Sequence, residues 1–243
     1  MIPVITVSIP TYEIFSTIGA ISAVILLYFR LEDYSIKFLQ FLKYMLFAVA
    51  FLLIGSRLLF VMTYLTEIRS FGDLIFYILN GGIVFYGGLL GAIFGIWLCA
   101  KIRREDVGVF YNFCTPAFPL FHFWGRIGCF FAGCCYGIES HFGFPMAFDP
   151  EVTRFPVQLT ESACNLLIFT SLMLVSKYNK KTNLLRLYLI EYSVVRFILE
   201  FFRGDNVRGI WGGLSTSQII SMLIFAVEML SIIKQRRLKK ESD

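Results

Sequence analysis

The sequence predicts an all-α integral membrane protein of about seven transmembrane helices, and three observations lead to that fold class. Hydrophobic residues make up 57% of the 243 residues and charged residues only 16%, whereas soluble domains carry about 25% charged residues. Several apolar stretches approach the length of about 20 residues that a helix needs to cross a bilayer core. Most lysines and arginines lie in short clusters between these stretches.

Seven apolar stretches are the expected helices. Pro116 and Pro119 interrupt the fourth and the fifth is short, so kinked or half-buried helices would fit both. A small soluble core could not hide so many long apolar runs, and we expect residues 1–243 to form a single transmembrane domain. The stretches are Tyr12–Phe29, Phe41–Leu65, Leu74–Ala100, Val107–Phe123, Ser162–Val175, Leu184–Phe202 and Ser217–Ile233.

The positions of the basic clusters predict the orientation. Short cytoplasmic loops hold an excess of lysine and arginine, and such clusters follow the first, third, fifth and seventh stretches. We therefore expect the N-terminus outside and the C-terminus in the cytoplasm, with outward loops at about 66–72, 125–161 and 203–215 that contain no lysine. The clusters are Arg30 and Lys37; Lys101, Arg103 and Arg104; Lys177, Lys180 and Lys181; and Lys234, Arg236, Arg237, Lys239 and Lys240.

The net charge of +5 is explained by this topology. The basic residues form no face interleaved with aromatic residues, so the sequence predicts no nucleic-acid partner.

Four arginines inside or at the edge of expected helices are the first functional signal. A charge in a membrane helix costs at least about 2.5 kcal/mol, and guanidinium binds phosphate in a bidentate way. A group of arginines at the outer membrane edge suits a phospholipid head group, whereas pairing with internal carboxylates is the alternative. The arginines are Arg57, Arg126, Arg196 and Arg203, and the carboxylates are Glu161, Glu191, Glu200 and Asp205.

A glycine-rich run, Asn80–Gly91, is the second signal. Small residues allow a helix or a lipid to approach the backbone closely, which makes Gly87 and Gly88 candidates for such contacts. Helix packing alone explains these glycines well, but the phenol of Tyr86 needs a polar partner.

Three cysteines in the segment Gly125–Gly137 are the third signal, with His122 and His141 on either side. Their spacing matches none of the usual zinc patterns, so the sequence predicts no metal. A disulfide among Cys129, Cys134 and Cys135 and free thiols packed as small hydrophobes both stay open. A cysteine nucleophile with His141 as its base would lack a recognised signature.

These motifs together resemble the prolipoprotein diacylglyceryl transferase family, bacterial enzymes that move a diacylglyceryl group from phosphatidylglycerol to a lipobox cysteine. The stretch Gly125–Gly133 is similar to the family signature Gly-Arg-x-Gly-Asn-Phe-x-Asn-Gly-Glu. Residues 154–161, 196–203 and 215–221 are similar to further family motifs, and the resemblance covers residues 54–224. It implies that Arg126 and Arg203 are the essential arginines and that Arg126 binds phosphate.

The chain also departs from the family pattern. Tyr86 stands where the family typically has histidine, Cys129 and Ala132 replace two signature asparagines, and Cys134 replaces the signature glutamate. The phosphate-binding half of the motif set is kept and the polar catalytic half is altered, which is the pattern of a divergent subfamily.

The resemblance implies a multi-pass protein of the bacterial plasma membrane that binds phosphatidylglycerol and a prolipoprotein or another extracytoplasmic acceptor, and that needs no cofactor. Two alternatives stay open: a related transferase with a different acceptor, and a non-catalytic lipid-binding membrane protein. The catalytic candidates are Tyr86, Arg126, Glu161 and Arg203; the substrate-binding candidates are Arg57, Gly87, Gly88, Gly128, Cys129, Arg196 and Glu200; and the candidates for the base are Tyr86, His122, His141 and Glu161.

Overall fold

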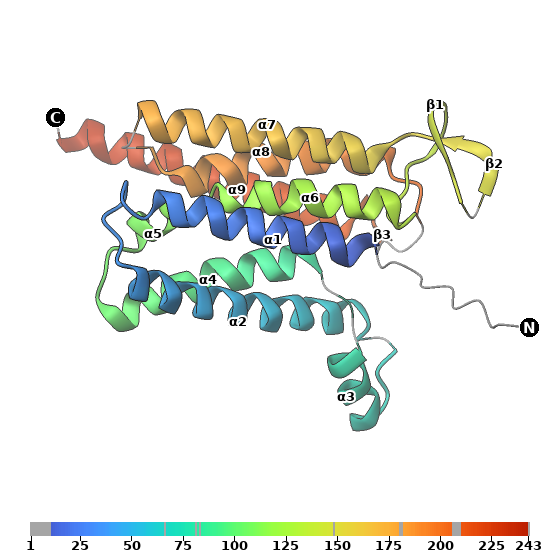
Figure 1. Cartoon of the computed structure of the whole chain (residues 1–243), viewed down its shortest axis with the longest axis horizontal. Coiled ribbons are helices and arrows are strands. Elements are labelled where there is room, and N and C mark those ends of the chain that lie inside the picture. The colour runs from blue at the N-terminus through green and yellow to red at the C-terminus, as the bar shows by residue number, and fades with distance from the viewer. Residues whose placement is uncertain are drawn as a thin grey trace, which may run out of the picture. The chain divides into compact units, whose positions relative to one another are not determined.

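The computed structural model describes residues 11–65, 67–80, 82, 84–147, 149–179, 182–205 and 210–242, most of which are helical (Figure 1). Some residues of the expectations above lie outside these ranges: Thr66, Gly81, Ile83, Lys180, Lys181 and residues 206–209. The described helices are α1 (Thr11–Arg30), α2 (Phe38–Thr63), α3 (Phe71–Asn80), α4 (Phe85–Arg103), α5 (Val107–Cys114), α6 (Ala117–Phe131), α7 (Val157–Tyr178), α8 (Leu184–Leu199) and α9 (Thr216–Ser242), with a 3-10 turn η1 (Glu200–Phe202).

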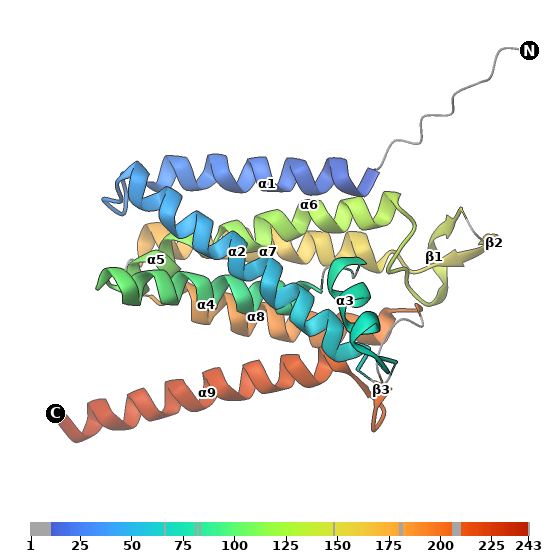
Figure 2. The same cartoon turned by 90° about the horizontal axis from the view of Figure 1, so that it is seen from below.

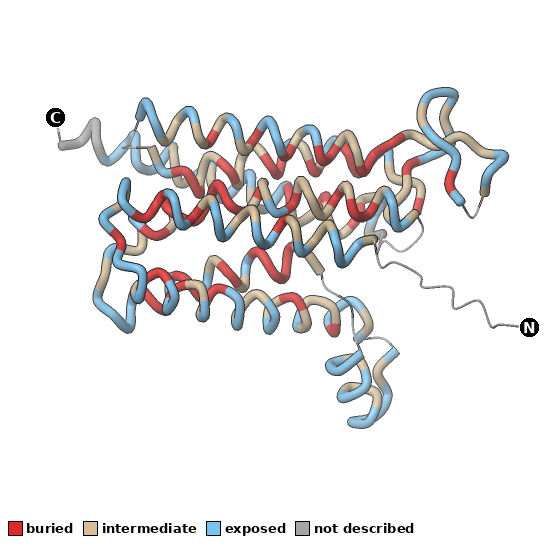
Figure 3. The backbone as a smooth tube through the Cα atoms, viewed as in Figure 1, coloured by how far each residue is buried: buried red, intermediate tan, exposed pale blue. Residues whose placement is uncertain are grey.

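Five of the described helices are long and apolar enough to cross a membrane: α1, α2, α4, α7 and α9. Exposed residues recur along these helices (Figure 3). On α9 they include the apolar residues Leu223, Val227 and Leu230. Such exposed apolar residues are unfavourable in water and suit hydrocarbon. The chain is therefore a polytopic membrane protein, while the count of seven helices and the outside N-terminus stay predictions.

Two expected helices are each broken into two. The third stretch forms the separate helices α3 and α4, and the N–H of Val84, the N-cap of α4, donates to Ser56 Oγ at 2.9 Å. The fourth stretch breaks at Pro116, which is the N-cap of α6. Proline lacks an N–H and disrupts a helix interior, but the first turn tolerates it, which is also where Pro119 lies.

The all-α prediction missed two small antiparallel pairs. Strands β1 (Glu139–Met146) and β2 (Asp149–Arg154) form one, and β3 (Ile210–Trp211) and β4 (Leu214–Ser215) form the other. The loop expected at about 125–161 is also shorter than predicted, because α6 continues to Phe131 and α7 begins at Val157. The fifth expected helix, which the sequence predicted to be short, is longer than expected, because α7 has 22 residues.

The chain divides into two compact units, Leu27–Thr115 and Met1–Leu26 with Pro116–Asp243. In the first unit, α2 and α4 run side by side (Figures 1 and 2). Glycines line their contact: a Cβ on Gly87 would clash with the carbonyl oxygen of Gly55, and one on Gly91 with that of Phe51. Close helix packing therefore accounts for Gly87 and Gly91.

Arg30, expected in a basic cluster, is 4% exposed and lies within the same unit. Its guanidinium donates to the backbone carbonyl oxygens of Asn112 at 3.1 Å and Phe113 at 3.3 Å. These carbonyls end α5, where a cation is favourable. Arg30 thus stabilises a helix C-terminus in addition to any role in topology.

We predict that Gly91→Ala lowers stability by about 1–3 kcal/mol, because the added methyl group meets the rigid backbone of α2. Gly88→Ala is the matched control on the same helix, since its Cβ would lie 3.4 Å from Leu52 Cγ. That change should be neutral or stabilising by up to about 1 kcal/mol through helix propensity. Thermal unfolding of both variants in detergent compares them, and equal midpoints would contradict the packing argument.

Candidate active site

A buried carboxylate, Glu161, is the centre of a polar cluster in the unit that contains α6, α7 and α8. Glu161 lies in the second turn of α7 and is 0% exposed. Its Oε2 accepts hydrogen bonds from Arg126 Nε at 2.7 Å and from Arg126 Nη2, and Arg196 Nη1 lies 3.4 Å away. One carboxylate oxygen therefore joins three helices.

The other oxygen of Glu161 faces two aromatic side chains. Tyr192 donates its hydroxyl to Oε1 at 3.3 Å, and His122 Nε2 lies 3.6 Å from the same atom. Helix periodicity explains the convergence, because His122 precedes Arg126 by four residues on α6 and Tyr192 precedes Arg196 by four on α8.

The ion pairs continue beyond Glu161 as an alternating row. Arg196 Nη2 lies 2.7 Å from Glu200 Oε2, Arg203 Nη1 lies 4.0 Å from the same oxygen, and Arg203 Nε donates to Asp205 Oδ1 at 2.9 Å. Three arginines are balanced by three carboxylates, which confirms internal pairing for these arginines. We call this set the charge chain: Arg126, Glu161, Arg196, Glu200, Arg203 and Asp205.

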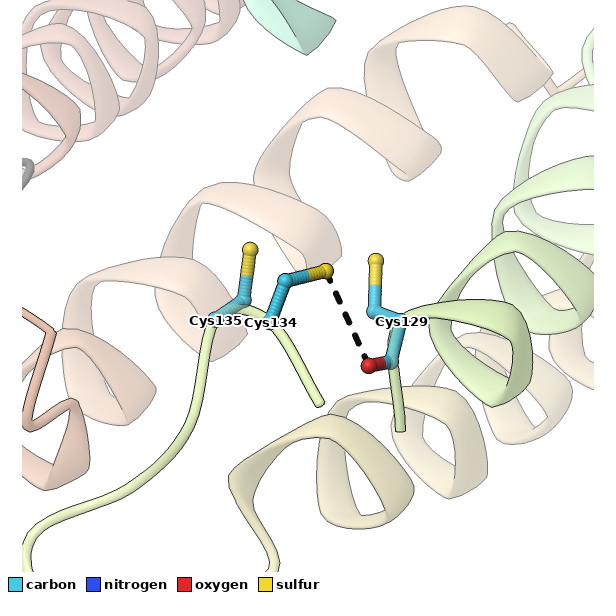
Figure 4. A group of neighbouring side chains, drawn as sticks. All are labelled: Cys129, Cys134 and Cys135. Carbon is cyan, nitrogen blue, oxygen red and sulfur yellow. Dashed lines mark hydrogen bonds between the residues drawn. The ribbon is translucent and has the colours of Figure 1, made fainter. Parts of the chain in front are cut away.

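The three cysteines of the signature segment come together at the end of α6. Their sulfur atoms all lie within 4.8 Å of one another (Figure 4). Gly133 (φ 69°) and Cys135 (φ 54°) adopt left-handed backbone conformations that fold the chain back, and the N–H of Cys134 donates to the carbonyl of Cys129 at 3.2 Å. All three are free thiols; Cys129 is buried and Cys134 is exposed.

The thiols belong to the same neighbourhood as the arginines. Arg126 Nη1 lies 3.8 Å from Cys129 Sγ. Hydrogen bonds with the thiols of Cys129 and Cys134 lower the pKa of Cys135, and the charges of Arg126 and Arg203 act in the same direction. Three thiols this close are also a ligand set for a soft metal ion.

The chain after the cysteines is fixed to the segment that carries Arg203. Gly137 and Arg203 form an antiparallel bridge, Ile138 N–H donates to the carbonyl of Phe202 at 3.0 Å, and Gly204 N–H donates to that of Tyr136 at 2.9 Å. A side chain at Gly137 would clash with the carbonyl oxygen of Phe155. The signature segment and Arg203 are thus held together by backbone contacts.

The other predicted site residues have separate settings. Arg57 lies on α2, and Tyr86, Gly87 and Gly88 are buried in the first turn of α4, all in the unit Leu27–Thr115. On α6, Gly128 packs against α1, because a Cβ there would lie 3.0 Å from Phe15 Cβ. His141 lies on β1 and is exposed.

Sequence reasoning missed three contributors to the site. Tyr192 donates to Glu161, Gln158 Nε2 donates to the carbonyl of Cys134 at 2.8 Å, and Asn165 Nδ2 donates to the carbonyl of Glu161 at 2.8 Å. Gln158 and Asn165 lie three residues before and four after Glu161, and this helical spacing of polar residues was the available signal.

Comparisons with known proteins cover most of this chain. A family model described as prolipoprotein diacylglyceryl transferase matches residues 1–234. The chain is 34% identical over 179 residues to phosphatidylglycerol–prolipoprotein diacylglyceryl transferase 2 of Clostridium perfringens, covering 71% of this chain and 70% of that protein. It is 30% identical over 233 residues to the phosphatidylglycerol–prolipoprotein diacylglyceryl transferase of Clostridium novyi, covering 92% and 90%.

We predict that Glu161→Gln lowers the free energy of unfolding by about 3–5 kcal/mol, because Arg126 and Arg196 lose the charge that compensates their burial. Glu139→Gln is the control: Glu139 is 3.9 Å from Arg154 and its side chain is 74% exposed, so the loss should be about 0–1 kcal/mol. Chemical unfolding in detergent measures both. Similar stability of the two variants would show that the buried pairs do not support the fold.

Proposed function

This chain belongs to the prolipoprotein diacylglyceryl transferase family, and we propose that its charge chain holds the phosphate of phosphatidylglycerol during transfer. The reaction moves the diacylglyceryl group to the cysteine thiol of a prolipoprotein. A bond forms between the thiol sulfur and the glyceryl carbon, the bond between that carbon and the phosphate oxygen breaks, and glycerol phosphate leaves with the electron pair.

One observation supports Arg126 most strongly as a phosphate ligand. Its Nε and Nη2 bind Glu161, while Nη1 lies 3.8 Å from the sulfur of Cys129. A thiol is a weak acceptor, whereas a phosphate oxygen forms a strong, charge-assisted hydrogen bond. We infer that Arg126 keeps Glu161 on one edge and binds the phosphate with Nη1.

Arg203 is the proposed second phosphate ligand, because the Gly137–Arg203 bridge fixes it to the signature segment. Negative charge builds on the departing glycerol phosphate, and donors oriented beforehand lower the barrier most. Glu161, Glu200 and Asp205 provide that orientation. We therefore assign Glu161 a positioning role instead of the base.

A groove between α8 and α9 suits an acyl chain of the lipid. It has a volume of about 310 Å³ and is lined by Ser193, Val194, Phe197, Ile198, Ser221, Met222 and Phe225. The cation Arg196 lies between Ser193 and Phe197 in the sequence of α8, and its Nη2 donates to Ser217 on α9 at 3.3 Å. An apolar groove beside a paired arginine matches a substrate with a charged head and apolar tails.

The acceptor thiol must lose its proton. Tyr86, His122 and His141 stay candidates for the base. A phenol with an ordinary pKa near 10 is a weak base at neutral pH, but a thiol with a pKa near 8.5 needs little help.

We place the protein in the plasma membrane of a bacterium, as a multi-pass protein with the segment at about 125–161 facing outward. The acceptor then approaches from the extracytoplasmic side, where the lysine-free loops are expected.

Release of glycerol phosphate from labelled phosphatidylglycerol by the purified protein in detergent tests the function. We expect release that requires a peptide with a lipobox cysteine. Release without the peptide would indicate a different acceptor, and no release in either case would favour a lipid-binding role without catalysis.

We predict that Arg126→Lys lowers peptide-dependent release by about 10²–10³-fold, because lysine keeps the charge but cannot hold Glu161 and the phosphate on two edges. Arg186→Lys is the control, since Arg186 forms its ion pair with Glu228 on α9 at 3.1 Å and takes no part in the proposed site. Full activity of Arg126→Lys would exclude the assigned role.

We also predict that Met222→Trp fills the groove and raises the KM for phosphatidylglycerol roughly tenfold, about 1.4 kcal/mol of lipid affinity, with kcat unchanged. Leu223→Trp is the control, because Leu223 is 60% exposed and does not line the groove. Steady-state kinetics at several lipid fractions separate the two constants. Equal KM values for both variants would remove the groove from the account.

A further inference from the structure

The gathering of Cys129, Cys134 and Cys135 is not explained by phosphate binding. Three thiolates bound to one ion at about 2.3 Å would lie about 4 Å apart, and these sulfur atoms lie within 4.8 Å of one another. The sequence spacing predicted no metal, because the ligands are brought together by a helix end and a left-handed turn.

The turn is held in place before any ligand arrives. Cys135 adopts a left-handed conformation that is strained for a residue with a side chain. Gln158, which is 0% exposed, donates Nε2 to the carbonyl of Cys134, and its Oε1 has no hydrogen-bond partner among the described residues. A rigid turn of this kind is what a preformed ligand set needs.

The surroundings also fit a bound cation. Three thiolates with a divalent ion leave one negative charge, and Arg126 Nη1 lies 3.8 Å from Cys129 Sγ as an outer partner. Cys129 is buried while Cys134 is exposed, which gives an ion a path into the site. Thiolate sulfur selects soft, closed-shell metal ions such as Zn²⁺.

We propose that Cys129, Cys134 and Cys135 bind one thiophilic divalent cation of the Zn²⁺ type as three thiolates, leaving a fourth position that takes the cysteine thiol of the acceptor. Three protein ligands and one open position are the pattern of catalytic zinc sites. The second half of this proposal rests on the proposed function.

The bound cation promotes the loss of the proton from the acceptor thiol, a step for which Tyr86 is a weak base. A thiol that coordinates the metal loses its proton to solvent. The resulting thiolate attacks the glyceryl carbon, and the carbon–oxygen bond breaks with its electrons on the phosphate held by Arg126. The atoms and charges balance without a further reactant.

Metal binding is tested on the full chain, purified in detergent under reducing conditions and loaded with Zn²⁺ or Cd²⁺. We expect one ion per chain by elemental analysis and a cadmium–thiolate absorption band. Cys134→Ser and Cys135→Ser each remove one proposed ligand and should weaken metal affinity at least about 100-fold. Losing only a hydrogen-bond partner of a ligand already costs up to about 100-fold. Cys164→Ser, a half-buried cysteine on α7, is the control and should bind normally.

Absence of retained metal and of the band would overturn the site, as would equal affinity in the cysteine variants and the control. Formation of a disulfide in place of metal binding, seen as the loss of two thiols in a thiol count, would also overturn it.

Acceptor coordination has its own readout. Adding the lipobox peptide to the cadmium-loaded protein should raise the thiolate band by about one third, from three sulfurs to four, and a Cys→Ser peptide should not. Chelation should abolish glycerol phosphate release and Zn²⁺ should restore it.

An unchanged band, or full activity after complete chelation, would overturn acceptor coordination. If no preparation releases glycerol phosphate, the proposed function fails. The cadmium–thiolate band, measured without and with the peptide, still tests the metal site and the coordination of the acceptor thiol.

Discussion

The buried carboxylate of Glu161 is the constraint on which the rest of the site depends. Placing Arg126 and Arg196 in a membrane-embedded bundle is costly, and an ion pair offsets that cost only with close geometry and additional hydrogen bonds. Glu161 meets both conditions, because Tyr192 satisfies its second oxygen. The same contacts bring α6, α7 and α8 together, so that the fold and the orientation of the proposed phosphate ligands have one cause.

Apolar periodicity and motifs predicted much of this structure. They located the long membrane helices and the arginine group, and Pro116 marked the break in the fourth stretch. They did not show the separation of α3 from α4. They also missed the hairpin β1–β2, since short polar strands give little signal. The partner Tyr192 and the gathering of the thiols depend on how side chains from different elements meet, which a single sequence does not specify.

The departures from the family pattern become coherent in three dimensions. By the resemblance of the signature segment, Cys129 and Cys134 replace a family asparagine and the family glutamate, and both belong to the thiol group beside Arg126. The arginine that we assign to the phosphate is therefore in contact with Cys129, one of the residues that have changed. A metal-bound acceptor thiolate beside Arg126 would link the altered half of the motif set to the retained half.

The location of the phosphate site is the central claim, and photo-crosslinking tests it most directly. A phosphatidylglycerol analogue with a photoreactive head group is irradiated with the protein in lipid nanodiscs, and adducts are mapped by mass spectrometry. The account predicts adducts in α6 and in the segment from α8 through Arg203 that unlabelled phosphatidylglycerol competes away. Competable adducts confined to other segments, with α6 and Arg203 unmodified, would contradict it.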